Sequence, residues 1–325
     1  MPSLIKRFAV VAILLALSSR AGAQSATATH AESRVASADI VPPQAAERSK
    51  SLEPQAAVPP AAGPTRFHAD PILDGALIGA SLGFGVVLEE ISSTGEIRPQ
   101  QISPSFDRSQ LLWIDRHSIP SSPSKSASSL SSAGLAVAVA FAFVDPVLSG
   151  FREQSLQTGL VDAAMYAESM SITFGLTNMV KLAVRRPRPG AYIEAEAHRN
   201  DPTFSNSNTD STLSFFSGHA SMTAAVGATA TYLAFARSPA PARPWLTLGI
   251  ATGLTTFVSV ERVRAGKHFP TDVMAGGLAG AGIGIIVPHL HRESDVEQRR
   301  VWIGMVAPLS DDTGETSMLG MSGVF

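Results

Sequence analysis

The chain has 325 residues, a formal net charge of -2, 45% hydrophobic residues and 16% charged residues. This nearly balanced charge argues against a globally basic nucleic-acid-binding protein. The composition is apolar for a soluble protein without being decisive for a membrane protein. The sequence contains no cysteine, so the fold is held together by packing without disulfides.

The N-terminus has the three parts of a secretory signal. Lys6 and Arg7 precede an apolar run at 8–17, and a small-residue cleavage site follows at 21–23. The run is shorter than the roughly 20 residues that a membrane span needs. The pattern predicts a signal peptide over residues 1–23 and export to the cell envelope; an uncleaved anchor is the alternative.

Residues 24–66 are rich in Ala, Pro, Ser and Gln and follow neither helix nor strand periodicity. This composition predicts a disordered linker. We expect the folded domain to cover residues 67–295. Residues 296–325 are expected to form a C-terminal extension with a short hairpin.

The folded domain is predicted to contain six apolar segments of helical length. Their approximate spans are 72–90, 127–148, 153–184, 217–237, 243–262 and 270–290. Prolines are expected to separate them, Pro146 and Pro288 included. Small residues in MAGGLAGAGIG (274–284) allow helices to approach closely. The sequence therefore predicts an all-α fold, a helical bundle of about six core helices.

Two relations to the membrane are consistent with these segments. Most uncharged runs are only about 12 to 17 residues long, short of a full span. Asp162 and Glu168 lie inside the third segment, where lipid would make them costly. These features favour a soluble periplasmic bundle, and a membrane-inserted bundle is the alternative.

Three short stretches carry residues suited to chemistry. The first is KLAVRRPRP (181–189), where Lys181 and Arg188 follow the third apolar segment. Pro187 and Pro189 stop the helix, so the chain turns there. Taken alone, this cluster could simply complement the negative end of a helix dipole.

The second stretch is SFFSGHAS (214–221), at the start of the fourth segment. Ser217 is suited to cap the helix, and Gly218 lets the backbone approach a ligand. Free N–H groups at a helix start bind anions, which would place His219 beside a bound phosphate. The alternative is a capped helix with an incidental histidine.

The third stretch is ERVRAGKHFPTD (261–272). Pro270 is suited to the first turn of the sixth helix, so His268 comes just before it. Asp272 would accept a hydrogen bond from one ring nitrogen of His268 and leave the other free to attack. Arg262 ends the fifth helix and can reach the same place. A basic loop before an N-terminal aspartate is the alternative.

Together these stretches supply cations, helix N-terminal amides, two histidines and one carboxylate. Metal-free phosphoryl transfer needs such a set, because cations neutralise the phosphoryl oxygens while one histidine attacks and the other protonates the leaving oxygen.

The order and spacing of these motifs resemble the type 2 phosphatidic acid phosphatase and vanadium haloperoxidase superfamily, whose signature is KxxxxxxRP, PSGH and SRxxxxxHxxxD. The resemblance covers roughly residues 70–290 and implies a helical bundle with a site at one end. It implies that His268 is the nucleophile, His219 the general acid and Asp272 the partner of His268. The phosphate-binding residues that it implies are Lys181, Arg188, Ser217, Gly218 and Arg262.

Two positions depart from this signature. Phe216 replaces the proline of the second motif, and Glu261 replaces the serine before Arg262. A glutamate inside the pocket would repel phosphate. We therefore expect Glu261 to point away and to pair with Arg264 or Lys267.

The expected function is a metal-independent phosphatase that acts on phosphate monoesters or diphosphates through a phosphohistidine. Its substrate would be a lipid phosphate or a small soluble ester, with membrane association as an open alternative. Two other functions stay open: a vanadium-dependent haloperoxidase, or a non-catalytic phosphate-binding envelope protein. No cofactor is expected except vanadate for the haloperoxidase, and no nucleic-acid partner is expected.

One further pair could bind a metal. His289 and His291 form an HxH pattern, but no cysteine or acidic residue lies beside them in the sequence. A helix C-terminus carrying histidines and Arg292 is the favoured interpretation, so no metal site is predicted.

Overall fold

The computed structural model describes residues 65–293, apart from 104–105, 120–121 and 202, and the strands at 307–310 and 316–319. The chain divides into residues 1–63 and 64–325. The first unit lies outside the described residues. The signal peptide at 1–23 and nearly all of the linker at 24–66 fall there and stay predictions.

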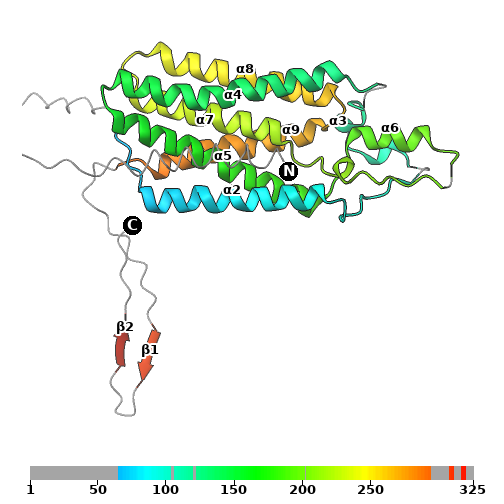
Figure 1. Ribbon diagram of the computed structural model, residues 1–325, viewed down its shortest axis with the longest axis horizontal. Coiled ribbons are helices and arrows are strands. Elements are labelled where there is room, and N and C mark those ends of the chain that lie inside the picture. The colour runs from blue at the N-terminus through cyan, green and yellow to red at the C-terminus, as the bar shows by residue number, and fades with distance from the viewer. Residues whose placement is uncertain are drawn as a thin grey trace, which may run out of the picture. The chain divides into compact units, whose positions relative to one another are not determined.

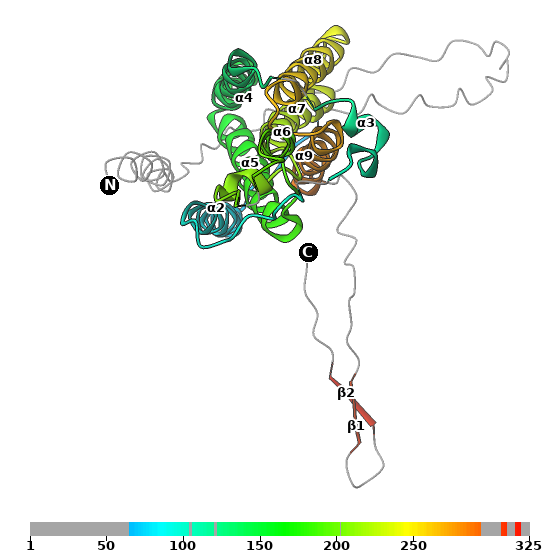
Figure 2. The same cartoon turned by 90° about the vertical axis from the view of Figure 1, so that its right-hand side faces the viewer.

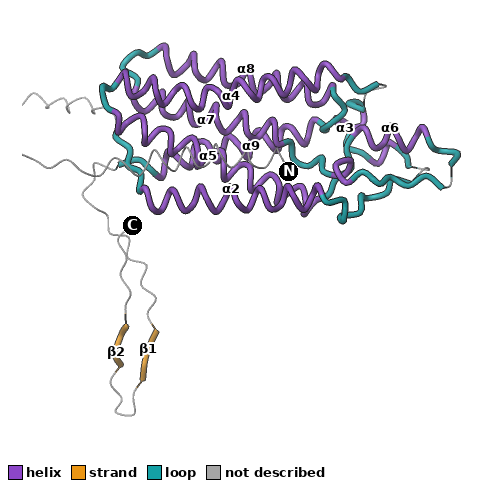
Figure 3. Tube along the Cα trace, viewed as in Figure 1, coloured by secondary structure: helices purple, strands orange, loops and turns teal. Residues whose placement is uncertain are grey.

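Each of the six predicted segments corresponds to a long helix (Figures 1 and 3). These helices are α2 (Pro71–Ser93), α4 (Lys125–Arg152), α5 (Leu156–Val184), α7 (Gly218–Arg237), α8 (Ala242–Arg264) and α9 (Pro270–Leu290). The short elements of the connections are η1 (Arg108–Gln110), α3 (Trp113–Arg116), α6 (Pro189–Ala197) and η2 (Thr209–Thr212). The all-α bundle predicted from the sequence is confirmed.

Local capping explains where the helices begin and end. The side chain of Asp70 accepts hydrogen bonds from the first turn of α2, and Ser217 caps α7 as predicted. Helix α5 ends at Val184 because Arg185 adopts the left-handed conformation, with φ 51°. Pro270 is the first residue of α9, as expected.

The prediction that Pro146 and Pro288 separate helices is wrong. Pro146 lies inside α4 and Pro288 lies inside α9. A proline removes one backbone hydrogen bond, and packing along a long helix can offset that loss. Both prolines are buried against neighbouring parts of the bundle.

Helix α7 packs against α9, α8, α5 and α4, and Figure 2 views this bundle nearly along its helices. Three glycines of α9, at one-turn intervals, face α7. A Cβ added at Gly276 would lie 2.7 Å from the carbonyl oxygen of Ser217. One added at Gly280 or Gly284 would overlap backbone carbonyl oxygens of α7. These small residues let α9 approach α7 closely. The close approach of helices at 274–284 was predicted, and the structure identifies α7 as the partner.

The exterior of the bundle is unusually apolar. Large hydrophobic side chains are exposed along its helices, among them Ile72, Phe151, Ile250, Leu278 and Leu290. Within the described residues, α2, α4 and α9 are long and apolar enough to cross a membrane. The expectation that the helices are too short to span was based on uncharged runs. It fails for these three, because the uncharged runs of α4 (126–144) and α9 (273–290) are longer than expected and α2 continues past Asp74 and Glu89.

The C-terminal strands form a hairpin of their own. Strand β1 (Ala307–Ser310) pairs antiparallel with β2 (Thr316–Leu319), with Ala307 opposite Leu319. The short C-terminal hairpin predicted from the sequence is confirmed.

Candidate active site

Four helix ends meet at one end of the bundle and bring the three motifs together. Lys181 lies in the last turn of α5 and Arg262 in the last turn of α8. His219 is the second residue of α7, and His268 lies just before α9. Contacts join these ends: a Cβ added at Gly218 would lie 3.7 Å from the Nζ atom of Lys181. The residues that the sequence analysis selected therefore converge.

The cationic side chains of this site have unused hydrogen-bonding capacity. Arg188 and Arg262 are only 8% and 7% exposed, and the Nε of each lacks a hydrogen-bond partner among the described residues. Arg188 does pair with Asp210 at 2.5 Å, but that carboxylate is half-exposed. Buried donors without acceptors are rare in proteins. Two buried guanidinium groups with spare N–H groups are suited to bind an anion.

His268 is buried and held in one tautomer. Its Nδ1 atom lies 2.7 Å from the carbonyl oxygen of Ser214. Because a carbonyl can only accept, Nδ1 carries the proton, and the lone pair of Nε2 faces the Nη2 atom of Arg262 at 3.5 Å. Burial, followed by the nearby charges of Arg188, Arg262 and Lys181, holds the pKa of His268 well below its usual range. The ring is therefore neutral, as a nucleophile must be.

His219 faces the same cations from the first turn of α7. Its Nε2 atom lies 3.3 Å from the hydroxyl of Ser132 on α4. Burial lowers the pKa of His219 to about 4, with further contributions from Arg262, Lys181 and Arg188. The three cations thus act electrostatically on both histidines, which is the convergence that phosphate binding requires.

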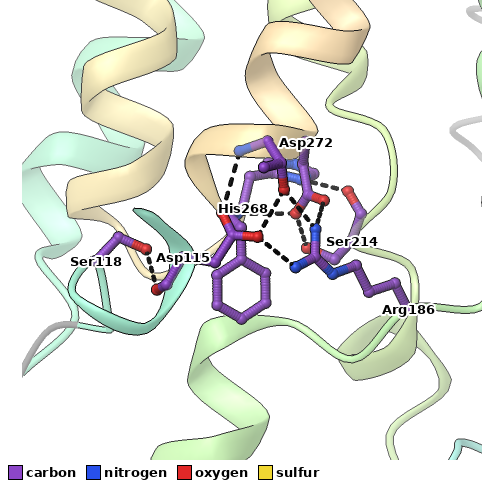
Figure 4. Close-up of polar contacts among 8 residues, drawn as sticks. Asp115, Ser118, Arg186, Ser214, His268 and Asp272 are labelled. Carbon is purple, nitrogen blue, oxygen red and sulfur yellow. Dashed lines mark hydrogen bonds and ion pairs between the residues drawn. The ribbon is translucent and has the colours of Figure 1, made fainter. Parts of the chain in front are cut away.

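The expected hydrogen bond between Asp272 and His268 is not present among the described contacts, and the ring bonds to Ser214 instead (Figure 4). Asp272 Oδ2 accepts a hydrogen bond from the Ser214 hydroxyl at 2.5 Å and another from the Phe269 N–H at 2.8 Å. The carboxylate is turned toward the start of its own helix, where free N–H groups need an acceptor. Among the described contacts, Asp272 is therefore linked to His268 indirectly, through Ser214 and through the backbone of Phe269.

Arg186 is a site residue that sequence reasoning missed. Its guanidinium bonds to Asp272 Oδ1 at 2.5 Å and to Asp115 Oδ2 at 2.7 Å (Figure 4). It also lies over the Phe269 ring, 4.3 Å from the centroid. Asp115 and Asp272 are fully buried, so Arg186 neutralises two carboxylates beside the candidate nucleophile. The motif RRPRP contained Arg186, but no local pattern could identify its partners.

Glu261, which departs from the family signature, pairs with Arg264 as predicted, although its Oε2 atom is buried without a hydrogen-bond partner among the described residues. It is buried, and its Oε1 atom pairs with Arg264 at 2.7 Å. The segment between the first and second motifs contains α6 and η2. Tyr192 of α6 packs edge-on against Phe269, with ring centroids 5.9 Å apart.

The other predicted phosphate ligands lie at the start of α7. Ser217 is fully buried, and its N–H donates to the backbone carbonyl of Asp272 at 3.1 Å. Its hydroxyl caps α7 by accepting from the N–H of Ala220. Gly218 is the first residue of α7 and lies beside Lys181. The backbone at Gly218 is therefore placed where an anion would meet the helix N-terminus.

Comparison with known proteins gives one family match. The model of the PAP2 superfamily matches residues 162–295, which contain all three motifs. A crystal structure described as the first transmembrane PAP2 type phosphatidylglycerolphosphate phosphatase from Bacillus subtilis is similar at 18% identity, with a TM-score of 0.41. That match covers 69% of this chain and 100% of the other. No curated protein matches the chain. The segment that carries the three motifs is therefore similar to the PAP2 superfamily.

Proposed function

We propose that this chain is a metal-independent phosphatase that hydrolyses phosphate monoesters or diphosphates through a phosphohistidine on His268. One observation carries the proposal: Lys181, Arg188 and Arg262 act on buried His268 and half-buried His219, and both arginines have an N–H without an acceptor among the described residues. A pocket of positive charge with a neutral imidazole suits a tetrahedral dianion. The match to the PAP2 superfamily supports this assignment.

In the first step, Nε2 of His268 attacks the phosphorus atom in line with the leaving oxygen. An N–P bond forms and the P–O bond breaks, while the cationic side chains stabilise charge on the phosphoryl oxygens. The proton stays on Nδ1 and is donated in a hydrogen bond to the carbonyl of Ser214, and this bond orients the ring. The leaving oxygen takes its proton from His219.

In the second step, water attacks the phosphohistidine. A new O–P bond forms, the N–P bond breaks, and the proton released by water returns to His219. This cycle needs His219 protonated when substrate is bound, although burial and three cations lower the pKa of His219 to about 4 in the free site. A bound phosphate dianion offsets those cations, so substrate binding itself raises the pKa of the general acid.

The apolar exterior favours a lipid phosphate as the substrate and membrane association through α2, α4 and α9. A bundle embedded in lipid would receive such a substrate from the bilayer. The predicted signal peptide supports a place in the cell envelope. A small soluble ester is the other substrate class, and an assay that compares both classes distinguishes them.

The decisive experiment measures phosphate release by the purified full chain in detergent micelles with excess chelator. It compares a phosphorylated lipid with a soluble aryl phosphate. We expect turnover that vanadate inhibits, because vanadate adopts the geometry of the transferring phosphoryl group. His268→Ala should lower kcat by about a thousandfold or more. His289→Ala, at the other end of α9, is the matched control and should retain activity.

Two results would contradict the proposal. One is no release of phosphate from either substrate class. The other is turnover that His268→Ala leaves unchanged. Peroxide-dependent bromination with added vanadate would indicate the haloperoxidase instead. Phosphate binding that protects against unfolding, without any hydrolysis, would indicate the non-catalytic function.

A further inference from the structure

A second cluster of ionisable side chains lies at the other end of the bundle. Asp74 belongs to the first turn of α2, Glu168 lies within α5, and His291 caps the C-terminus of α9. The Nε2 atom of His291 lies 3.3 Å from Asp74 Oδ2 and 3.3 Å from Glu168 Oε2. All three atoms lie within 4.8 Å of one another. The length of α9, about 30 Å, separates this cluster from the candidate active site.

The imidazole of His291 is oriented by its other nitrogen. Its Nδ1 atom lies 2.8 Å from the carbonyl oxygen of Val287. Nδ1 must donate in that bond, so Nε2 is the atom directed at the two carboxylates. A backbone carbonyl that fixes the tautomer and directs the second nitrogen is the usual outer-shell arrangement of a metal-binding histidine.

The two carboxylates are buried without the partners that other buried acids have. The side chains of Asp74 and Glu168 are 10% and 6% exposed. Their Oδ2 and Oε2 atoms lack any hydrogen-bond partner in the described part of the chain. By contrast, buried Asp162 pairs with Arg237 through both oxygens, at 2.5 and 2.6 Å. Two buried carboxylate oxygens without a hydrogen-bond donor, together with a ring nitrogen, form a set of ligands suited to a metal cation.

We propose that Asp74, Glu168 and His291 bind a divalent transition-metal ion, with zinc as the probe. Two ligands of a tetrahedral zinc ion, each about 2.0–2.1 Å from the metal, are about 3.3 Å apart. The distances from His291 Nε2 to the two carboxylate oxygens are both 3.3 Å. Two carboxylates would also neutralise the charge of the ion.

The site has a structural role and takes no part in the proposed phosphoryl transfer. The ion joins α2, α5 and α9 beside the point where Phe67 and Arg292 form a backbone bridge. It thereby ties the first and last helices of the bundle together. In the HxH pattern, His289 takes no part, because its Nδ1 atom lies 2.9 Å from the hydroxyl of Tyr232.

The test uses the purified full chain in detergent, freed of metal with chelator and then titrated with zinc. We expect one zinc ion per chain and a rise in Tm of several degrees. Glu168→Gln and His291→Gln should each lower zinc affinity at least tenfold, since even outer-shell changes cost tenfold or more. His289→Gln is the matched control from the same HxH pair and should bind zinc like the wild type.

Cobalt titration of the wild type keeps the proposal testable if the variants do not fold. Cobalt in the cluster should give visible d–d absorption bands that zinc abolishes. Absence of these bands, or zinc binding that survives both Glu168→Gln and His291→Gln, overturns the proposal. A wild-type Tm that zinc does not change also overturns it. The phosphatase proposal is tested in excess chelator with His268→Ala, which does not involve the proposed zinc site. The two proposals can therefore fail separately.

Discussion

The Nδ1 atom of His268 lies 2.7 Å from the carbonyl oxygen of Ser214, and the hydroxyl of the same serine donates to Asp272 at 2.5 Å. The candidate nucleophile is thus oriented by a backbone group. The carboxylate of Asp272 acts on His268 indirectly, because it holds the segment that carries Ser214 in place. Side-chain substitutions can separate these two effects, because none of them removes the carbonyl.

Ser214→Ala should lower kcat only about tenfold, while Asp272→Ala should lower it much further. The alanine at 214 keeps the carbonyl that holds His268 and loses one hydrogen bond, which is a change of about 1–1.5 kcal/mol. The alanine at 272 leaves Ser214, Phe269 and Arg186 without their shared acceptor. Steady-state kcat and KM on the preferred substrate measure both. If Ser214→Ala is as inactive as His268→Ala, the backbone does not suffice to orient the ring.

Arg186→Met should destabilise the folded chain by about 3–5 kcal/mol. It removes the one guanidinium that bonds both Asp115 and Asp272, and it leaves two buried carboxylates beside each other. Thermal unfolding in detergent should show a clear fall in Tm. Arg199→Met, at an exposed position, is the control and should unfold like the wild type. An unchanged Tm for Arg186→Met would mean that these carboxylates are protonated or otherwise paired.

Anion binding should be linked to proton uptake by His219. Burial and the charges of Arg262, Lys181 and Arg188 lower the pKa of His219 to about 4 in the free site, and a bound dianion raises it. Binding therefore strengthens as pH falls from the ordinary histidine pKa of about 6.5 toward this value. Sulfate is the probe, because it keeps its double charge over this range. Calorimetry should show the pH dependence in the wild type and a nearly flat profile in His219→Gln. Equal slopes in the two proteins would assign the proton to another group.

Gly280→Ala should destabilise the bundle, whereas Gly277→Ala should be neutral or slightly stabilising. A Cβ at Gly280 would overlap the carbonyl oxygen of Ser221, while a Cβ at Gly277 meets nothing within 4 Å. Overpacking costs about 1–3 kcal/mol, and alanine is favoured over glycine in a helix by up to about 1 kcal/mol. Tm measurements on the two variants check this. Similar Tm values would indicate that α7 and α9 are farther apart than the structure has them.

Cysteine labelling should place the two ends of α2 on opposite sides of a membrane. The chain has no cysteine, so single introduced cysteines report without background. Arg66→Cys precedes α2 and Glu96→Cys follows it, while Arg292→Cys lies beside Arg66 through the bridge of Phe67 with Arg292. In sealed vesicles, an impermeant reagent should label Arg66→Cys and Arg292→Cys alike, and Glu96→Cys only after permeabilisation. If the chain is inserted in the opposite orientation, Glu96→Cys is labelled at once and the other two only after permeabilisation. Labelling of all three from one side would favour the soluble bundle.

The helices and the main site residues were predictable from the sequence because local chemistry sets them. Apolar segments bounded by caps and prolines mark the helices. Ser217 and Pro270 start α7 and α9 through interactions within one turn. The motifs around Lys181, His219 and His268 lie at helix ends, and a helix end is a local property. The resemblance to a known superfamily then indicated that these ends meet.

Only the tertiary structure decided which side chains pair, because pairing depends on how helices far apart in the sequence pack and rotate against one another. Arg186 meets Asp115 across 71 residues, and the carbonyl of Ser214 meets His268 across 54. His291 was dismissed as a metal ligand for lack of acidic neighbours, and the fold brings Asp74 and Glu168 to it from two other helices. No local pattern carries such information, since the free energy that sets each pairing comes from the packing of the whole bundle.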